Sequence, residues 1–88
     1  MDPNPQDVQA KQQAHFEKAR KALLKFLNEK GGTLPLADLH DYSLNRYFVQ
    51  HQAFSRLMET LVDEKLVDYD FAKVEATITP TGKTFAAS

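Results

Sequence analysis

The chain contains no cysteine, so it can form neither a disulfide framework nor a thiolate metal site. It also has no apolar run near the roughly 20 residues that a membrane helix requires. The polar, proline-bearing start, Met1 to Gln12, lacks the apolar stretch of a signal peptide. These absences predict a cytoplasmic protein with no membrane partner.

The residues that catalysis or metal binding would need are also missing. The histidines His15, His40 and His51 lie on separate predicted elements, without a His or Glu partner one helical turn away. Gly31-Gly32 follows a predicted helix and does not precede one, so it is not a phosphate loop. His40 and Asp41, which with Ser43 would make a triad, are adjacent on one helix and cannot face each other, and no nucleophile elbow or oxyanion-hole glycine is present. We therefore expect neither an enzyme nor a cofactor.

The composition that remains is typical of one small folded domain. Of the 88 residues, 42% are hydrophobic and 26% charged, which is enough for one modest core. We predict a disordered tail over residues 1–7, which holds Pro3 and Pro5, and a single domain over residues 8–88. The net charge of −1 hides an asymmetry: Val8 to Lys30 has six Lys/Arg against two carboxylates, and Thr33 to Ser88 has five against eight.

A long helix is predicted from about Val8 to Lys30, ended by Gly31-Gly32. Its apolar positions recur at steps of three and four residues: Phe16, Ala19, Leu23, Phe26 and Leu27. The basic run flanking this stripe is predicted to be an exposed face: Lys18, Arg20, Lys21 and Lys25. At about 35 Å the helix is longer than the domain needs, and its first half is available for a homodimer contact.

Shorter elements follow. We predict an extended segment at Thr33–Leu36, a brief helix to about Tyr42 or Ser43, and a turn over Leu44–Gln50 with at most one helical turn. The next helix, His51 to about Lys65, has one apolar face: Phe54, Leu57, Met58, Leu61 and Val62.

Alternating residues then predict strands at Leu66–Phe71 and Val74–Thr79, joined near Ala72-Lys73. After Thr79-Pro80 only a turn or two of helix can follow. Phe48 and Val49 are predicted to form an exposed apolar pair, and the other aromatic residues of this half, Tyr42, Tyr47 and Phe54, to pack in the core and turns.

This order of elements resembles a winged helix-turn-helix domain of the MarR and PadR type. The resemblance rests on the stretch Phe54 to Val67, which ends in Lys65-Leu66-Val67 where the family has a similar Gly-Leu-Val, and on Ile78-Thr79-Pro80-Thr81-Gly82. It covers roughly Lys18 to Phe85 and implies an α+β fold, a small winged helix of three helices plus a two- to three-stranded antiparallel hairpin sheet.

The resemblance also implies a function: a transcriptional regulator that reads double-stranded DNA with the helix 51–65 and the hairpin 66–79. It places base-facing side chains at Gln52, Ser55 and Arg56, with His51 and Asn45 at the approach to the helix. Lys73 at the hairpin tip and Arg46 before the helix would contact phosphate.

The charge of this region leaves a second function open. Five carboxylates surround the proposed DNA face: Glu59, Asp63, Asp68, Asp70 and Glu75. Such carboxylates repel phosphate within a Debye length of about 8 Å at physiological salt. The alternative is a winged helix that docks a protein partner, through the acidic hairpin face or through Phe48 and Val49, and does not bind DNA.

Overall fold

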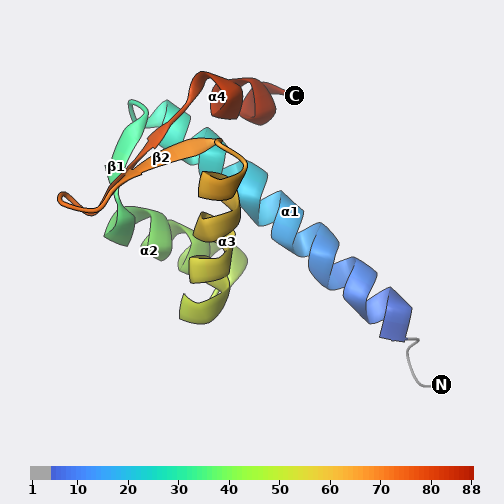
Figure 1. Cartoon of the computed structure of the whole chain (residues 1–88). Coiled ribbons are helices and arrows are strands. Elements are labelled where there is room, and N and C mark those ends of the chain that lie inside the picture. The colour runs from blue at the N-terminus through green and yellow to red at the C-terminus, as the bar shows by residue number, and fades with distance from the viewer. Residues whose placement is uncertain (1–4) are drawn as a thin grey trace.

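The computed structural model describes the backbone of residues 5–88 and the side chains of residues 14–88. Its elements follow in the order α1 (Pro5–Glu29), β1 (Thr33–Pro35), α2 (Leu36–Tyr47), α3 (His51–Asp63), β2 (Val67–Asp70), β3 (Glu75–Ile78) and α4 (Pro80–Ala87). Figure 1 shows the long α1 running past the rest of the molecule towards the N-terminus, with α2 and α3 on one side of the sheet end and α4 on the other.

The sheet has three antiparallel strands in the order β1-β3-β2. Thr33 pairs with Thr77 across β1 and β3, and Asp70 pairs with Glu75 at the last rung of the β2–β3 hairpin. One face of the sheet is buried, because Val67, Ala76 and Ile78 are at most 5% exposed. The hairpin ends in the loop 71–74, where the Asp70 carboxylate accepts hydrogen bonds from the amides of residues 72 and 73 at 2.9 and 3.2 Å.

The core joins helices, sheet and C-terminal segment in one cluster. It comprises Ala19, Leu23, Leu24, Leu27, Leu39, Val49, Phe54, Leu57, Met58, Leu61, Leu66, Val67, Ala76, Ile78 and Ala86. The central part of α1 therefore packs against every layer of the fold, and α4 lies along it (Figure 1). This burial fixes the position of α3, so that its other face is turned to the outside.

Two helices end in the same hydrogen-bond pattern, with different residues at the left-handed position. At the end of α1, Gly31 has φ 102°, and the Gly32 amide donates to the Leu27 carbonyl at 2.9 Å. After α3, Lys65 has φ 60°, and the Leu66 amide donates to the Leu61 carbonyl at 2.9 Å. Both are Schellman motifs, which usually place glycine where α3 has Lys65.

The Thr-Pro-x-Gly segment joins the hairpin to α4. The Thr79 hydroxyl accepts from the Gly82 amide at 2.9 Å and donates to the Lys65 carbonyl at 2.7 Å. Pro80 occupies the first turn of α4, where its missing N–H costs nothing. Gly82 has no space for a side chain, because a Cβ would overlap the Leu66 carbonyl oxygen and lie 2.8 Å from Ile78 Cγ1. The segment therefore closes the base of the hairpin.

The predicted α+β class and small antiparallel sheet are confirmed, and several details differ. The second helix does not end near Ser43 but continues to Tyr47, whose carbonyl accepts a hydrogen bond from His15 Nε2 on α1 at 2.8 Å. Leu44–Tyr47 is therefore helix and not turn. The first helix begins at Pro5, three residues before its predicted start. The predicted tail over residues 1–7 stays a prediction, with residues 1–4 outside the described residues.

Two predictions about exposure are wrong in part. Phe48 is 82% exposed as expected, but Val49 is buried, because Phe48 takes a left-handed backbone (φ 56°) that turns consecutive side chains to opposite sides. Arg20, which the sequence predicts on the exposed basic face, is only 5% exposed. Its guanidinium lies between α1 and the end of α3, where it bonds to Glu64 at 2.5 Å and to Glu17 at 2.8 Å.

Candidate functional site

The helix α3 has one buried and one open face. Phe54, Leu57, Met58 and Leu61 are buried against α1, α2 and the sheet. The open face carries the polar residues, which are exposed: Gln52, Ser55, Arg56, Glu59 and Asp63. Gln50 stands at the N-cap without a side-chain hydrogen bond, so the first backbone amides of α3 have no side-chain cap. The open face of α3 is thus exposed from Gln52 to Asp63.

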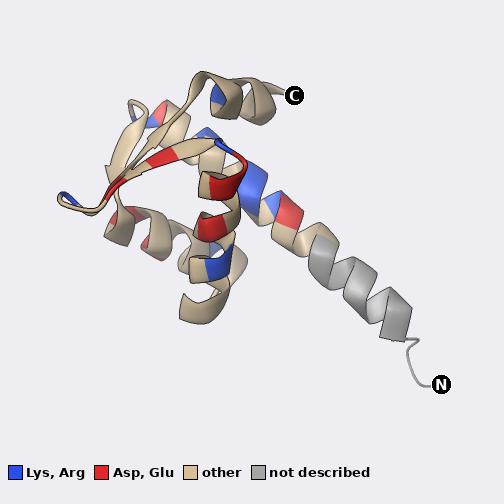
Figure 2. Cartoon of the chain, in the orientation of Figure 1, with Lys and Arg blue, Asp and Glu red and all other residues tan. Residues whose placement is uncertain are grey.

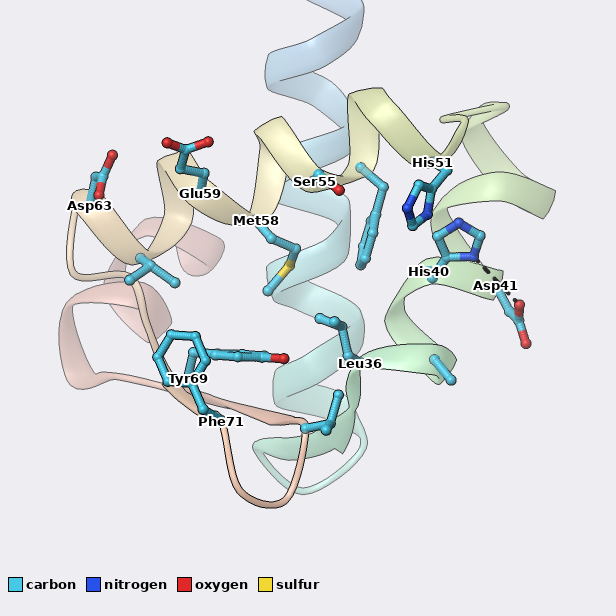
Figure 3. Close-up of a pocket in the computed structure, with 14 residues that line it drawn as sticks. Leu36, His40, Asp41, His51, Ser55, Met58, Glu59, Asp63, Tyr69 and Phe71 are labelled. Carbon is cyan, nitrogen blue, oxygen red and sulfur yellow. Dashed lines mark ion pairs between the residues drawn. The ribbon is translucent and has the colours of Figure 1, made fainter.

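A groove of about 680 Å³ lies between α3, the start of α2 and the hairpin. We call it the α3–hairpin groove. Figure 3 shows α3 along one edge with Met58 pointing into the groove, and Tyr69 and Phe71 on the opposite edge. Its lining is Leu36, Ala37, His40, Asp41, His51, Phe54, Ser55, Met58, Glu59, Val62, Asp63, Tyr69, Phe71 and Val74. Most of these side chains are apolar, so the groove suits an apolar ligand surface better than a phosphate backbone.

Two histidines meet at one end of this groove. The ring centroids of His40 and His51 are 5.6 Å apart, and His40 stands edge-on to Phe54 at 5.0 Å. His40 Nδ1 lies 3.8 Å from a carboxylate oxygen of Asp41 (Figure 3). Spacing did not indicate this pair, because the residues are eleven positions apart on different helices. Within the described side chains no three His, Asp or Glu residues gather as a metal site would need.

The structure divides the residues predicted to bind DNA into separate places. Gln52 and Arg56 lie on the open face of α3, and His51 and Ser55 line the α3–hairpin groove. Lys73 is in the loop at the hairpin tip. The remaining two predicted residues, Asn45 and Arg46, are exposed on α2 and line a second, smaller hollow of about 370 Å³ beside Phe26 and Lys30 of α1.

The surface formed by α3 and the hairpin is acidic. Residues 51–79 contain three cations, Arg56, Lys65 and Lys73, against six carboxylates, which gives a net charge of −3. Figure 2 shows acidic residues on α3 and β2 and basic residues gathered on α1. Any DNA contact here depends on a few cations and not on a general positive field.

One of the six carboxylates is already neutralised. Glu64 accepts from Arg20, whose side chain is 6% exposed. Burial opposes the charge of Arg20, but its hydrogen bonds to Glu64 and Glu17 outweigh that effect and raise the pKa of the guanidinium above its usual value. Arg20 therefore stays charged and holds the end of α3 to α1. Sequence reasoning missed this role because Glu64 lies 44 residues further along the chain.

Four large apolar side chains near the site are exposed. Phe48 and Phe71 are 82% and 85% exposed, and Val62 and Val74 are 39% and 48% exposed. Phe71 and both valines line the α3–hairpin groove, whereas Phe48 stands apart at the α2–α3 turn. Grouped apolar exposure of this kind marks a contact surface.

Comparison with solved structures shows which fold this is. The chain is similar to the structure described as "Crystal structure of MepR like protein complexed with pseudoligands", with a TM-score of 0.60 and 18% sequence identity over 92% of this chain. It spans 63% of the length of that protein. No protein-family model matches the chain, and no curated protein matches it significantly. The likeness confirms the winged-helix fold that the sequence resemblance implied.

Proposed function

We propose that this winged helix is a DNA-binding transcriptional regulator that inserts α3 into the major groove. The observation that supports this most is the open face of α3, where Gln52 and Arg56 lie one turn apart and exposed on a helix already fixed by its buried face. The major groove is about 12 Å wide and admits an α-helix. Arg56 suits a guanine edge and Gln52 an adenine edge.

The hairpin and the helix approach would supply the phosphate contacts. Lys73 lies at the hairpin tip on a loop that Asp70 holds in place, and Arg46 is exposed on α2. The uncapped first turn of α3 adds backbone amides and the positive end of the helix dipole. With so few cations, we expect binding to depend mainly on base contacts. A plot of the logarithm of the binding constant against the logarithm of the salt concentration should then have a slope no steeper than about −3 per protomer.

The test is a fluorescence titration with a randomised pool of duplexes, followed by selection for the tightest sequences. Binding is expected at about 50 mM salt, and Arg56→Ala should lower the affinity for the selected DNA sequence by about tenfold or more. Lys83→Ala is the matched control, because it removes one exposed positive charge on α4 and should have little effect.

Two results would contradict the proposal. One is the absence of any binding to the pool at low salt, where electrostatic affinity is greatest. The other is an equal loss of affinity in Arg56→Ala and Lys83→Ala, which would mean that only net charge matters.

Docking of a protein remains the second candidate function, and the net charge of −3 over α3 and the hairpin favours it. It uses the side of α3 that faces the α3–hairpin groove, which shares Ser55, Glu59 and Asp63 with the open face.

A further inference from the structure

The α3–hairpin groove is a built surface and not a gap between loose segments. The Leu36 amide at the start of α2 donates to the Val74 carbonyl at 2.9 Å, which holds the hairpin end against α2. Phe71 stands edge-on to Tyr69 with ring centroids 4.7 Å apart. The Phe71 ring is therefore held along the groove although it is 85% exposed.

The charged residues at the rim of the groove, around its apolar floor, are all acidic. Its lining includes the carboxylates Asp41, Glu59 and Asp63 and, among the described residues, no lysine or arginine. Glu59 and Asp63 make no ion pair within the described part of the chain. They are one helical turn apart, and Figure 3 shows both above the groove on α3. Like charges at this spacing destabilise a helix by about 0.2–0.5 kcal/mol, which a bound cation would relieve.

From the apolar floor and the acidic rim we infer that the groove docks a basic amphipathic helix of a partner protein. Such a helix would place apolar anchors at i, i+3, i+4 and i+7 against Met58, Val62 and Phe71. Its flanking lysines or arginines would face Glu59 and Asp63. The volume of about 680 Å³ accommodates a short row of side chains and not a whole second domain.

Other occupants fit this surface less well. The carboxylate rim repels nucleic-acid phosphate. A second copy of the chain offers one basic helix, α1, but its apolar stripe is already used: Leu23, Leu24 and Leu27 are at most 1% exposed. The inference goes beyond the proposed DNA contact and does not depend on it, because Gln52 and Arg56 lie outside the groove lining.

The test uses the full chain and a synthetic peptide of leucine and lysine, about four helical turns long, with leucines at the helical spacing given above. A peptide with glutamate in place of lysine, and a leucine–lysine peptide of scrambled order, are the probe controls. Fluorescence anisotropy should give a micromolar dissociation constant for the basic amphipathic peptide and no binding for the two control peptides. In NMR spectra of the protein, the amide signals that shift on addition of this peptide should be those of the residues that line the groove.

Two exposed substitutions and two matched controls then locate the site. Phe71→Ser and Asp63→Lys should each lower the affinity for the basic peptide by about tenfold. Phe48→Ser removes an equally exposed phenylalanine outside the groove, and Glu29→Lys reverses an exposed charge on α1, so both should stay within about twofold of the unchanged protein.

Any of four results would overturn the inference. They are absence of binding at millimolar peptide, equal binding of the acidic or scrambled peptide, an equal loss in the two control variants, and self-association of the chain that Phe71→Ser abolishes. The last would assign the groove to a second copy. Loss of DNA binding in a separate titration has no bearing on these outcomes, so the failures of the two proposals are distinguishable.

Discussion

At the scale of single residues, three of the non-glycine residues in the described range 5–88 adopt a left-handed backbone: Phe48, Lys65 and Val74, with φ between 55° and 60°. Phe48 directly follows α2, Lys65 is the second residue after α3, and Val74 directly precedes β3. This conformation costs a non-glycine residue about 1–2 kcal/mol, and it is least favourable for the β-branched Val74. The turns around the candidate site are thus held in place by the surrounding packing against local strain.

Lys65 gives the clearest test of that strain. Lys65→Gly should stabilise the chain by about 0.5–1 kcal/mol, because relief of the left-handed strain exceeds the extra freedom glycine gives the unfolded chain. Urea unfolding measures the change. Lys65→Ala is the control: it removes the charge but keeps a Cβ, and should change stability by less than about 0.5 kcal/mol. Equal stabilisation by both would mean that charge, and not backbone strain, is responsible.

At the scale of elements, periodicity alone predicted α3 and the hairpin, because their buried faces follow helix and strand spacing closely. It failed where long-range contacts decide the outcome. The last turn of α2 is held by His15 of α1, and Arg20 is buried because Glu64 meets it from the end of α3. The His40–His51 contact likewise exists only once α2 and α3 are packed. Local sequence patterns do not indicate such contacts between residues that are far apart in the chain.

The packing of α1 on α2 gives a prediction about pH. Tyr42 stacks on Phe26 with ring centroids 4.0 Å apart, and burial, together with neighbouring Tyr47, raises the pKa of the Tyr42 phenol above its usual value of 10.0. The folded state therefore holds the proton more tightly than the unfolded chain does. The resulting stability is fully present below about pH 10 and is lost as pH rises through the folded pKa.

The substitution Tyr42→Phe tests the direction of this pH dependence of stability. The free energy of unfolding of the unchanged protein should fall more steeply between about pH 9 and pH 11 than that of the variant, whereas the two should be similar near pH 8. Urea titrations at the three pH values measure the difference. Parallel pH profiles would show that other groups, such as lysines, cause any alkaline loss.

At the scale of the whole molecule, the shape is elongated and the charge is distributed unevenly along the chain. The 25 residues of α1 give the chain an elongated shape, with extents of 48 × 26 × 21 Å. Residues 14–35 carry five cations against two carboxylates, and residues 36–79 carry four against eight. The net positive charge thus lies on α1 and the net negative charge on α2, α3 and the hairpin, so partners of opposite charge would meet different surfaces.

The length of α1 leads us to propose a homodimer formed through its N-terminal half. Sedimentation should then show a dimer at about 100 µM that dissociates on dilution, and the midpoint of thermal unfolding should rise with protein concentration. A monomer over the whole range, with a constant midpoint, would contradict the proposal.

The junction between hairpin and α4 has a mechanical consequence for all these contacts. Thr79 bonds to Lys65, its amide donates to the Leu66 carbonyl at 3.0 Å, and Gly82 lies directly against that carbonyl. These contacts join the hairpin base to α4, and α4 packs on α1. A shift of α4 on the surface of α1 would therefore be passed to the hairpin base, and through it to the loop 71–74 that bears Lys73.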